Sequence, residues 1–469
     1  MLQKTENKMS NNNKSKSLHI AMYPWFAFGH FTSFLHLANK FAERGHKISF
    51  FHPTKTLPKL STHNHHPNLI TFIPISVPPI DGLPLGAETT NDVPASARPL
   101  IMDAMNLTRP VIDSQLALLK PDFIFFDLTE WLPDVARKHS VKSVYFSTVY
   151  AVAFAYLSPP ARNVPDNYRF NEADLVDPPP GFPCSDIRLR AHEAREFGDL
   201  CSRDFGGLPF MEKNVRSFKE CDVVCFKTSR EMEGDYCDYV EKHYGNKPVY
   251  LTGPMVPKPP SSKLDDSFDC WLKGFGNGTL VYCALGSECV LDKDQFQELI
   301  LGLELTGRPF LAALRPPSGY ETIEQALPEG YSERIKGRGI IDGGWVQQQL
   351  MLHHPSVGCF VTHCGAGSLS EAMLSECQIV LIPQAVDQFI NARMMSLDLK
   401  VGVEVDKGEN DGLFTKQDVF KAIEVVMEQE SIVGREVRAN HTKWRNLLLE
   451  EGLEESYIDG FVQSLQGLF

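Results

Sequence analysis

The chain has 469 residues, which suits two α/β domains of about 200 residues better than one or three. Hydrophobic residues make up 43%, an ordinary share for a globular protein, and the longest apolar runs have only the length of strands, so we expect no membrane span. The formal net charge of −13 argues against a nucleic-acid partner, because its phosphates would repel an acidic protein.

Residues 1–17 are polar, contain several lysines and lack an apolar core, so they predict a disordered start rather than a signal peptide or an anchor. The eleven cysteines are odd in number and form no C-x-x-C pair, and no histidine cluster has zinc spacing. Several, such as Cys225, Cys283 and Cys359, lie within predicted core strands. This usage favours buried, reduced thiols in a cytoplasmic protein.

The first elements along the chain predict a parallel sheet. Residues 18–23 form a strand, 24–30 a loop, 31–44 an amphipathic helix and 47–51 a second strand. Ligands of such sheets gather beyond the carboxyl ends of the strands, and His30 lies at such an end. A lone histidine in this position is more often structural or solvated than catalytic.

Asp127 follows the predicted strand 123–126 and lies at the same kind of strand end as His30. It is a candidate for chemistry, although an aspartate there can equally cap a helix. Glu130 is a nearby but weaker alternative. The next predicted strand, 144–148, ends at Thr148.

The middle of the chain contains the predicted domain boundary. Residues 159–195 are rich in proline and aspartate, which is typical of an irregular loop that lines a binding pocket. The second domain should begin near residue 251, with an exposed linker at 258–263. We therefore assign residues 18–250 to the first domain, 251–445 to the second, and 446–469 to a C-terminal helix that packs back on the first.

In the second half, residues 279–285 predict a strand that ends at Gly286-Ser287, followed by a helix at 295–305 and strands at 309–314 and 339–342. Asp292-Lys293-Asp294 has the spacing of a metal-binding D-x-D pair. Because it directly precedes a helix, capping explains it, and we expect no metal site.

A strand at 358–362, a glycine-bearing turn and a helix come next, and this geometry aims backbone N–H groups and a helix dipole at an anion. We expect Gly365 and Gly367 to permit close approach, Ser368 to cap the helix and bind phosphate, and His363 to add a donor. An ordinary strand-to-helix turn is the simpler alternative.

The flanks of this turn favour a nucleotide-sugar site. Trp345 can stack on a base, Glu371 lies one helical turn beyond the phosphate turn and can hold a ribose, and Asp387-Gln388 can bind sugar hydroxyls. Residues 345–388 as a whole resemble the 44-residue signature box of plant family 1 UDP-dependent glycosyltransferases. The matching positions are Trp345, Gln348, His363-Cys364-Gly365, Ser368, Glu371 and Asp387-Gln388.

The resemblance extends from about Leu18 to about Phe461 and implies the GT-B fold, an α/β architecture with two Rossmann-like domains facing each other across a cleft. In the family's pattern, His30 is the general base, and Asp127 orients it and balances its charge. The chain has Ser33 where the family often has proline. The resemblance also implies an acceptor site with Phe26, Phe28 and Trp131, and a donor site with Thr148, Ser287, Trp345, Val346, Gln348, His363, Gly365, Ala366, Gly367, Ser368, Glu371, Asp387 and Gln388.

Two positions depart from the family's usual His-Cys-Gly-Trp-Asn-Ser, since Ala366 and Gly367 replace the tryptophan and the asparagine. The same replacements occur in the branch that adds a sugar to a sugar of flavonoid, anthocyanin and other phenolic glycosides. We therefore expect an inverting transferase of this sugar-on-sugar type. A glucosyltransferase for aglycones and an inactive UDP-sugar-binding protein are the alternatives.

Gln388 usually accompanies glucose in the family, but the sugar-on-sugar branch also includes rhamnose and xylose users, so all three donors stay open. We expect UDP-sugar as a substrate and a small phenolic glycoside as the acceptor. We expect no further cofactor, no metal, no nucleic acid, a monomer and a cytoplasmic location.

Overall fold

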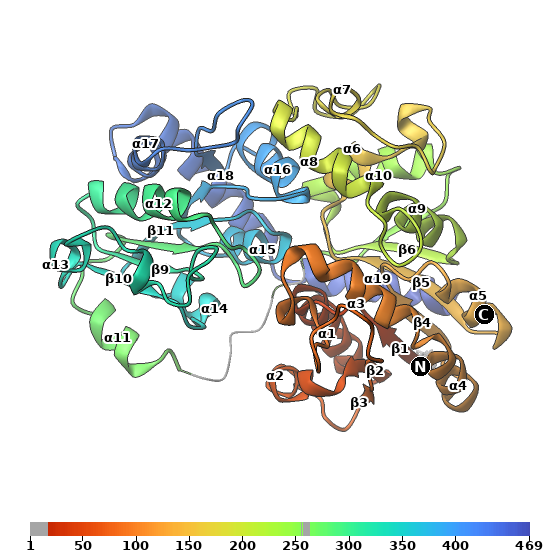
Figure 1. Cartoon of the computed structure of the whole chain (residues 1–469). Coiled ribbons are helices and arrows are strands. Elements are labelled where there is room, and N and C mark those ends of the chain that lie inside the picture. Colours follow the sequence, from red (N-terminus) through yellow and green to blue (C-terminus); the bar gives the residue numbers. More distant parts are fainter. Residues whose placement is uncertain (1–16, 255, 257–262) are drawn as a thin grey trace, which may run out of the picture.

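The computed structural model describes residues 17–254, 256 and 263–469, and the elements below belong to this part of the chain. The disorder expected for residues 1–17 lies outside the described residues except at Ser17, and so does nearly all of the linker at 258–263. Two parallel sheets form the centres of two halves (Figure 1). The predicted α/β fold class is confirmed.

The first sheet has seven parallel strands in the order β3-β2-β1-β4-β5-β6-β7. In chain order its strands are β1 His19–Tyr23, β2 Lys47–Pro53, β3 Ile70–Ile75, β4 Phe123–Phe126, β5 Lys142–Ser147, β6 Val223–Phe226 and β7 Val249–Leu251. Its helices are α1 Phe28–Glu43, α2 Leu57–Ser61, α3 Arg98–Asn106, α4 Arg109–Leu119, α5 Leu132–Lys138, α6 Ala151–Leu157, α7 Glu172–Leu175, α8 Ala191–Ser202, α9 Phe210–Glu220 and α10 Arg230–His243. Short 3₁₀ turns occupy Thr54–Thr56, Thr90–Asp92, Ala95–Ala97 and Pro160–Arg162.

The second sheet has six parallel strands in the order β10-β9-β8-β11-β12-β13. In chain order its strands are β8 Leu280–Ala284, β9 Phe310–Ala313, β10 Gly339–Asp342, β11 Val357–Thr362, β12 Gln378–Leu381 and β13 Gly402–Glu404. Its helices are α11 Asp266–Leu272, α12 Lys293–Leu305, α13 Tyr331–Ile335, α14 Gln348–Leu352, α15 Ala366–Leu374, α16 Asp387–Arg393, α17 Lys416–Met427 and α18 Ile432–Leu448, and α19 Leu453–Gln466 follows. A 3₁₀ turn at Glu324–Ala326 and a π turn at Met394–Asp398 complete this half.

Each sheet has one point where the strand order reverses, and crevices for ligands open at the carboxyl ends of the strands at such points. In the first sheet the reversal lies between β1 and β4, and in the second between β8 and β11. His30 lies in the first turn of the helix after β1 and Asp127 in the loop after β4, while the loops after β8 and β11 carry Ser287 and His363. The strand order alone therefore places these four candidate residues at the reversal points of their sheets.

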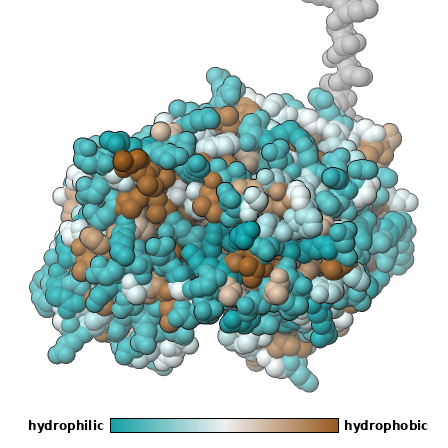
Figure 2. Space-filling model, turned by 90° about the horizontal axis from the view of Figure 1, so that it is seen from above, coloured by the Kyte–Doolittle hydropathy of each residue, from teal (hydrophilic) through white to brown (hydrophobic). Residues whose placement is uncertain are grey.

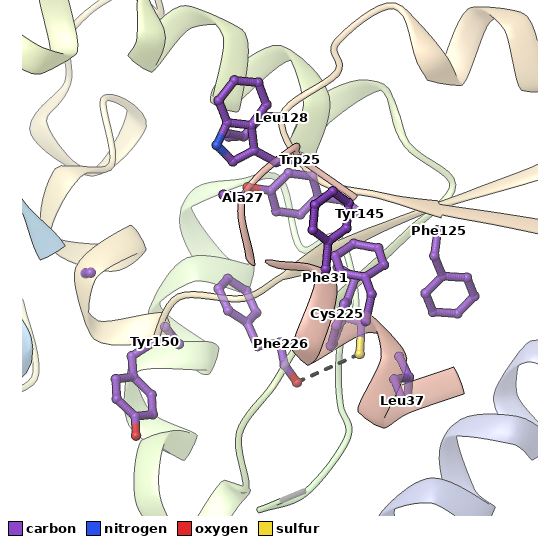
Figure 3. Packing of buried hydrophobic residues seen from close by; sticks show 14 of the residues in the cluster. Trp25, Ala27, Phe31, Leu37, Phe125, Leu128, Tyr145, Tyr150, Cys225 and Phe226 are labelled. Carbon is purple, nitrogen blue, oxygen red and sulfur yellow. Dashed lines mark hydrogen bonds between the residues drawn. The ribbon is translucent and has the colours of Figure 1, made fainter. Parts of the chain in front are cut away.

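Aromatic side chains fill the core of the first half. Phe125 on β4, Tyr145 on β5 and Phe226 on β6 are buried together with Phe31 of α1 (Figure 3). All eleven cysteines are free, and eight of them are buried, including Cys225, Cys283 and Cys359. Burial raises the pKa of such thiols, so they act as small apolar core residues.

The chain returns to the first half at its end. Helix α19 lies beside α1, where Glu454 pairs with Lys40 and Asp459 accepts a hydrogen bond from Arg44 at 2.5 Å. Helix α18 packs instead on α15 and α17 of the second half. Residue 446, the expected start of the returning helix, lies inside α18, and the chain crosses over in the turn at 449–452.

Two local expectations need correction. Helix α1 begins at Phe28, so His30 lies in the first turn of a helix and not in the preceding loop. Asp292 does occupy the N-cap position of α12, but its side chain makes no capping hydrogen bond.

No helix among the described residues is long and apolar enough to cross a membrane. The face seen from above is largely hydrophilic, and its hydrophobic side chains occur in small, separate patches (Figure 2).

A buried carboxyl group on α10 makes stability depend on pH. Glu233 is 1% exposed, and its Oε1 accepts the backbone N–H of Val152 in the first turn of α6 at 2.9 Å. Burial raises the pKa of Glu233 from 4.5 to about 7. Because the folded-state pKa is the higher one, its contribution to stability is complete below pH 4.5 and is lost as the pH rises through about 7.

We therefore expect Glu233→Gln, which keeps the accepting oxygen, to raise the free energy of unfolding at pH 8 by on the order of 2 kcal/mol, with a much smaller gain at pH 5. Thermal unfolding at both pH values measures the difference. Asp235→Asn, at an exposed position of the same helix, is the control. A Glu233→Gln variant that is less stable than the parent at pH 8 would show that the ionised carboxylate is needed.

Candidate active site

His30 and Asp127 form a close pair at the reversal point of the first sheet. The Nδ1 atom of His30 lies 2.5 Å from Oδ2 of Asp127. The other carboxylate oxygen, Oδ1, accepts the backbone N–H groups of Trp25 and Leu128, each at 2.8 Å. The Asp127 side chain is 3% exposed and that of His30 23%. The carboxylate is therefore fixed from several sides, while part of the imidazole faces outward.

This contact determines what the imidazole can do. A carboxylate that accepts from Nδ1 keeps the proton on that nitrogen, so Nε2 carries the lone pair that can take a proton from a ligand. Thr148 Oγ1 also lies 3.1 Å from Nδ1 of His30. Thr148, expected near the donor sugar, thus belongs to the surroundings of the histidine.

The alternatives for Asp127 lose support from the geometry. Helix α5 begins at Leu132 with Trp131 at its N-cap position, so Asp127 does not cap it. Glu130 forms an ion pair with Lys213, whose side chain is completely buried. Because Glu130 is already needed there, Asp127 is the carboxylate that serves His30.

The three expected acceptor residues differ in exposure. Phe26 is completely buried and packs edge-on against Tyr23 with ring centroids 5.9 Å apart. Trp131 is 6% exposed, and its Nε1 donates to Asn106 Oδ1 at 2.9 Å. Phe28 alone among the three is half-buried. Phe26 and Trp131 thus belong to the hydrophobic core, and Phe28 is the one of the three whose side chain is partly open to a ligand.

The anion-binding turn lies at the reversal point of the second sheet. Helix α15 begins at Ala366 with Gly365 as its N-cap residue. A Cβ atom on Gly365 would lie 2.6 Å from Nε2 of His363, and one on Gly286 would lie 2.8 Å from the same ring. Both glycines are therefore required by the imidazole between them. Gly367, in contrast, has open space around it, so the close approach of a ligand expected there stays a prediction.

His363 is neutral at pH 7, because burial lowers its pKa to about 4. It can offer a hydrogen bond to a phosphate but no positive charge. The favourable potential for an anion must come from the start of α15, whose first N–H groups have no partner within the helix.

Ser368 and Glu371 are linked through Gln348. The Nε2 group of Gln348 donates to Ser368 Oγ at 3.1 Å and to Glu371 Oε2 at 2.7 Å. Ser368 is the third residue of α15, so the expectation that it caps the helix is wrong, since Gly365 already holds that extended position. Burial raises the pKa of Glu371.

Trp345 is 79% exposed, whereas Val346 beside it is buried at 6%. Because so much of the indole is exposed, its burial contributes little to the stability of the fold. This exposure is consistent with a ring face that is open for stacking.

Helix α16 presents Asp387 and Gln388 in its first turn. Asp387 Oδ2 accepts from Asn391 Nδ2 at 3.0 Å, and the same Asn391 group donates to the carbonyl of Cys364 in the anion-binding turn at 3.1 Å. Burial raises the pKa of Asp387 to about 6. Gln388 Oε1 accepts the backbone N–H groups of Gln384 and Ala385, which leaves its Nε2 group for a ligand. A carboxylate acceptor and an amide donor side by side suit adjacent sugar hydroxyls.

The sequence did not point to contacts that join the two halves at this site. Tyr150 Oη lies 3.2 Å from Ser370 Oγ and 3.4 Å from the carbonyl of Ala366 on α15. Glu288, next to Ser287, accepts from Thr90 at 2.5 Å and pairs with Arg98 at 3.2 Å. Neither contact has a local sequence pattern, although Asn391 could have been found from its i, i+4 spacing to Asp387.

Two doubly wound sheets, with a histidine–carboxylate pair on one and an anion-binding helix start on the other, define a two-domain protein of the GT-B class. Glycyrrhiza uralensis UGT73P12, solved with glycyrrhetinic acid 3-O-monoglucuronide, has the same fold, with a TM-score of 0.80 over 97% of this chain and 96% of that chain at 22% identity. Arabidopsis thaliana UGT89C1 has a TM-score of 0.74 over 96% and 100% at 20% identity.

Residues 321–436 match the family model for UDP-glucoronosyl and UDP-glucosyl transferases. Cyanidin 3-O-galactoside 2''-O-xylosyltransferase of Actinidia chinensis var. chinensis is 54% identical over 96% of this chain and 99% of its own length. Anthocyanidin 3-O-glucoside 2''-O-glucosyltransferase of Ipomoea nil is 51% identical over 97% and 99%. The chain belongs to the family of UDP-dependent glycosyltransferases, as its resemblance to the signature box implied.

A prediction concerns the nucleotide. Trp345→Ala and Glu371→Ala should raise the KM for the UDP-sugar more than they lower kcat, because base and ribose lie far from the anomeric carbon and are bound alike in ground and transition states. Loss of a stacked base costs about 1–3 kcal/mol, or roughly 5- to 150-fold in KM for Trp345→Ala. Ile432→Ala, at another exposed apolar position, is the control. A large drop in kcat at unchanged KM would place the nucleotide elsewhere.

Proposed function

We propose that the protein transfers a sugar from a UDP-sugar to a sugar hydroxyl of a flavonoid or other phenolic glycoside, with inversion at the anomeric carbon. The observation that carries this proposal is the 2.5 Å contact between His30 and Asp127 on the sheet opposite the anion-binding turn. The relatives at 54% and 51% identity, named as transferases that act on sugars of anthocyanin glycosides, support the acceptor class.

The reaction follows from the residues in place. His30 Nε2 takes the proton of the acceptor hydroxyl as its oxygen attacks the anomeric carbon, and Asp127 balances the imidazolium that forms. The oxygen arrives opposite the departing UDP, so an α-linked donor gives a β-linked product. Negative charge that develops on the diphosphate is stabilised by the start of α15, with hydrogen bonds from His363 and Ser368.

Residues of the chain thus supply both the general base and the groups that stabilise the departing UDP. The proposed reaction therefore needs the UDP-sugar as donor but neither a metal ion nor a further cofactor. The free cysteines suit a reducing compartment, and we place the enzyme in the cytoplasm. The donor is glucose, xylose or rhamnose; the relatives named above include a xylosyl- and a glucosyltransferase.

UDP release tests the proposal. Purified protein is incubated with UDP-glucose, UDP-xylose or UDP-rhamnose and either no acceptor, a flavonoid aglycone or its 3-O-glycoside. We expect release with one donor to depend on the glycoside and to exceed that with the aglycone at least tenfold in kcat/KM. Equal or greater release with the aglycone would favour the aglycone-directed alternative, and no acceptor-dependent release with any donor would favour an inactive binding protein.

Ala366 provides a prediction for acceptor specificity. It opens α15, is half-buried, and its carbonyl accepts from Ser370 Oγ at 2.8 Å. A tryptophan here would place a large side chain near the donor sugar and crowd the sugar of a glycoside acceptor. A clash in a packed site costs about 1–3 kcal/mol, so Ala366→Trp should reduce kcat/KM for glycosides roughly 5- to 150-fold.

The same substitution should affect any reactive aglycone much less. Val433→Trp, which adds the same side chain at an exposed position of α18 outside the site, is the control. Unchanged activity of Ala366→Trp on a glycoside would show that the small residue does not make room for the acceptor sugar.

A further inference from the structure

Four charged side chains, of which Glu193 and Arg393 are buried, connect the two halves of the molecule where α8 lies next to α16 (Figure 1). Arg393 at the end of α16 donates through Nη2 to both oxygens of Glu193 on α8, at 2.9 and 2.8 Å. Through Nη1 it donates to both oxygens of Glu404 on β13, at 2.6 and 2.7 Å. Arg190 closes the ring with hydrogen bonds to Glu193 at 2.9 Å and Glu404 at 2.8 Å.

The ring differs from a surface ion pair in its burial. The side chains of Glu193, Arg393 and Glu404 are 0%, 7% and 11% exposed. Burial alone would raise the pKa of Glu193, but the charges of Arg393 and Arg190 hold it below its ordinary value. Charges this deep are tolerated only when geometry and hydrogen bonding are nearly complete, so the ring strongly restricts where α8 and α16 can lie relative to each other.

Apolar contacts reinforce the same junction. Phe389 of α16 lies between two side chains of α8, with ring centroids 6.3 Å from Phe197 and 6.1 Å from His192. The backbone N–H of His192 also donates to the Glu409 carbonyl at 3.3 Å. Helix α8, which begins within the predicted excursion at 159–195, is thus fixed to the second half.

Helix α16 carries this constraint to the donor end of the site. It has seven residues, with Asp387 first and Arg393 last, so a fixed Arg393 leaves the Asp387 end little freedom about 9 Å away. The residue before Asp387 needs such support, because Val386 has φ +46°, a left-handed conformation that β-branched residues adopt only under strain. Lys407 adds a hydrogen bond to the carbonyl of Pro383 at the start of the same loop.

We propose that Glu193 and Arg393 are positioning residues for the donor sugar: through α16 they hold Asp387 and Gln388 at the sugar hydroxyls. This inference rests on the proposed function. The ring also attaches α8, which belongs to the acceptor-side half, to α16, which carries the donor-sugar residues. It therefore fixes the position of the donor sugar relative to the acceptor-side half. In this proposal Glu193 and Arg393 act through α16 and do not themselves touch the substrate.

Glu193→Gln tests the proposal with limited risk to folding, because Arg393 keeps its paired contacts with Glu404. The affinities of UDP and of the best donor among UDP-glucose, UDP-xylose and UDP-rhamnose are measured by calorimetry, together with kcat. We expect UDP affinity to stay within twofold, the donor's affinity to fall about fivefold, and kcat to fall about tenfold. Glu193→Asp, which keeps the charge, should recover part of both losses.

Glu424→Gln, which breaks the ion pair with Arg308 inside the second half, is the matched control and should leave all three quantities unchanged. If Glu193→Gln does not fold, Arg393→Lys is measured instead. It keeps the positive charge but loses the paired hydrogen bonds to Glu193 and Glu404, and the same changes in affinity and kcat are expected. Equal losses for UDP and UDP-sugar, or no loss of either, would overturn the proposal.

Asp387→Asn separates this inference from the proposed function. If Asp387→Asn lowers the affinity for UDP-sugar but not for UDP, while Glu193→Gln lowers neither, the positioning role is wrong and the sugar site stands. If Asp387→Asn leaves the affinity for UDP-sugar unchanged, the donor sugar is bound elsewhere, and both the sugar site and the inference fail.

Discussion

Replacing His30 by alanine is expected to lower kcat by about 10²–10⁴-fold, the usual contribution of a general base. Among the described residues at the first reversal point, His30 lies 2.5 Å from a carboxylate that holds a proton on its Nδ1 atom, which leaves Nε2 to accept another. Without it, the acceptor hydroxyl must attack before it loses its proton. UDP affinity should stay within about twofold, because the nucleotide residues belong to the other sheet.

Steady-state kinetics with the glycoside acceptor and calorimetry with UDP measure the two quantities. His243→Ala, in the last turn of α10, removes another half-buried histidine of the same half and should keep parental kcat. If His30→Ala keeps more than a third of the parental kcat, the base is another group.

Asp127→Asn is expected to have an effect of similar size, about 10²–10⁴-fold in kcat, for a different reason. The amide keeps an oxygen for the N–H groups of Trp25 and Leu128, so the loop should retain its shape. At the Oδ2 position, however, an N–H₂ group replaces an acceptor. It would donate to Nδ1 of His30, place the proton on Nε2 and leave the base in the wrong tautomer without a balancing charge.

The Glu130→Gln variant shows whether a second carboxylate shares the role. Because Glu130 pairs with the buried Lys213, its substitution should lower the melting temperature while kcat of the folded enzyme changes little. A mild effect of Asp127→Asn together with a severe kcat loss in Glu130→Gln would reverse the assignment.

Regular elements and the donor segment could be predicted from the sequence because their patterns are local. The strands at Phe123–Phe126 and Gly339–Asp342 have the predicted bounds, since short apolar runs with clear breaks leave little ambiguity. The order of residues from Trp345 to Gln388 likewise predicts a site along one strand-turn-helix unit. His30 was placed in the loop because the helix was expected to begin at Phe31, whereas it begins at Phe28, and helix ends are the least predictable part of such a pattern.

Contacts between distant segments could not be predicted. Glu193 and Arg393 are separated by 200 residues. Arg190 and Glu193 have the i, i+3 spacing of a local pair, but nothing in the sequence joins that pair to Arg393. The same holds for Tyr150 and Ser370, which meet only when the two sheets face each other. Serine is a common N-cap residue, so the sequence suggested Ser368 as the cap. In the structure Gly365 is the N-cap residue, and the ring of His363 leaves no room for a Cβ atom there.

The structure of the reaction product tests the central claim most directly. A flavonoid 3-O-glycoside is converted with the best UDP-sugar, and the product's new bond is located by NMR and mass spectrometry. We expect the added sugar on a hydroxyl of the acceptor's own sugar, with β configuration when the donor is α-linked UDP-glucose. A new bond to an aglycone oxygen, or an anomeric configuration retained from the donor, would contradict the account.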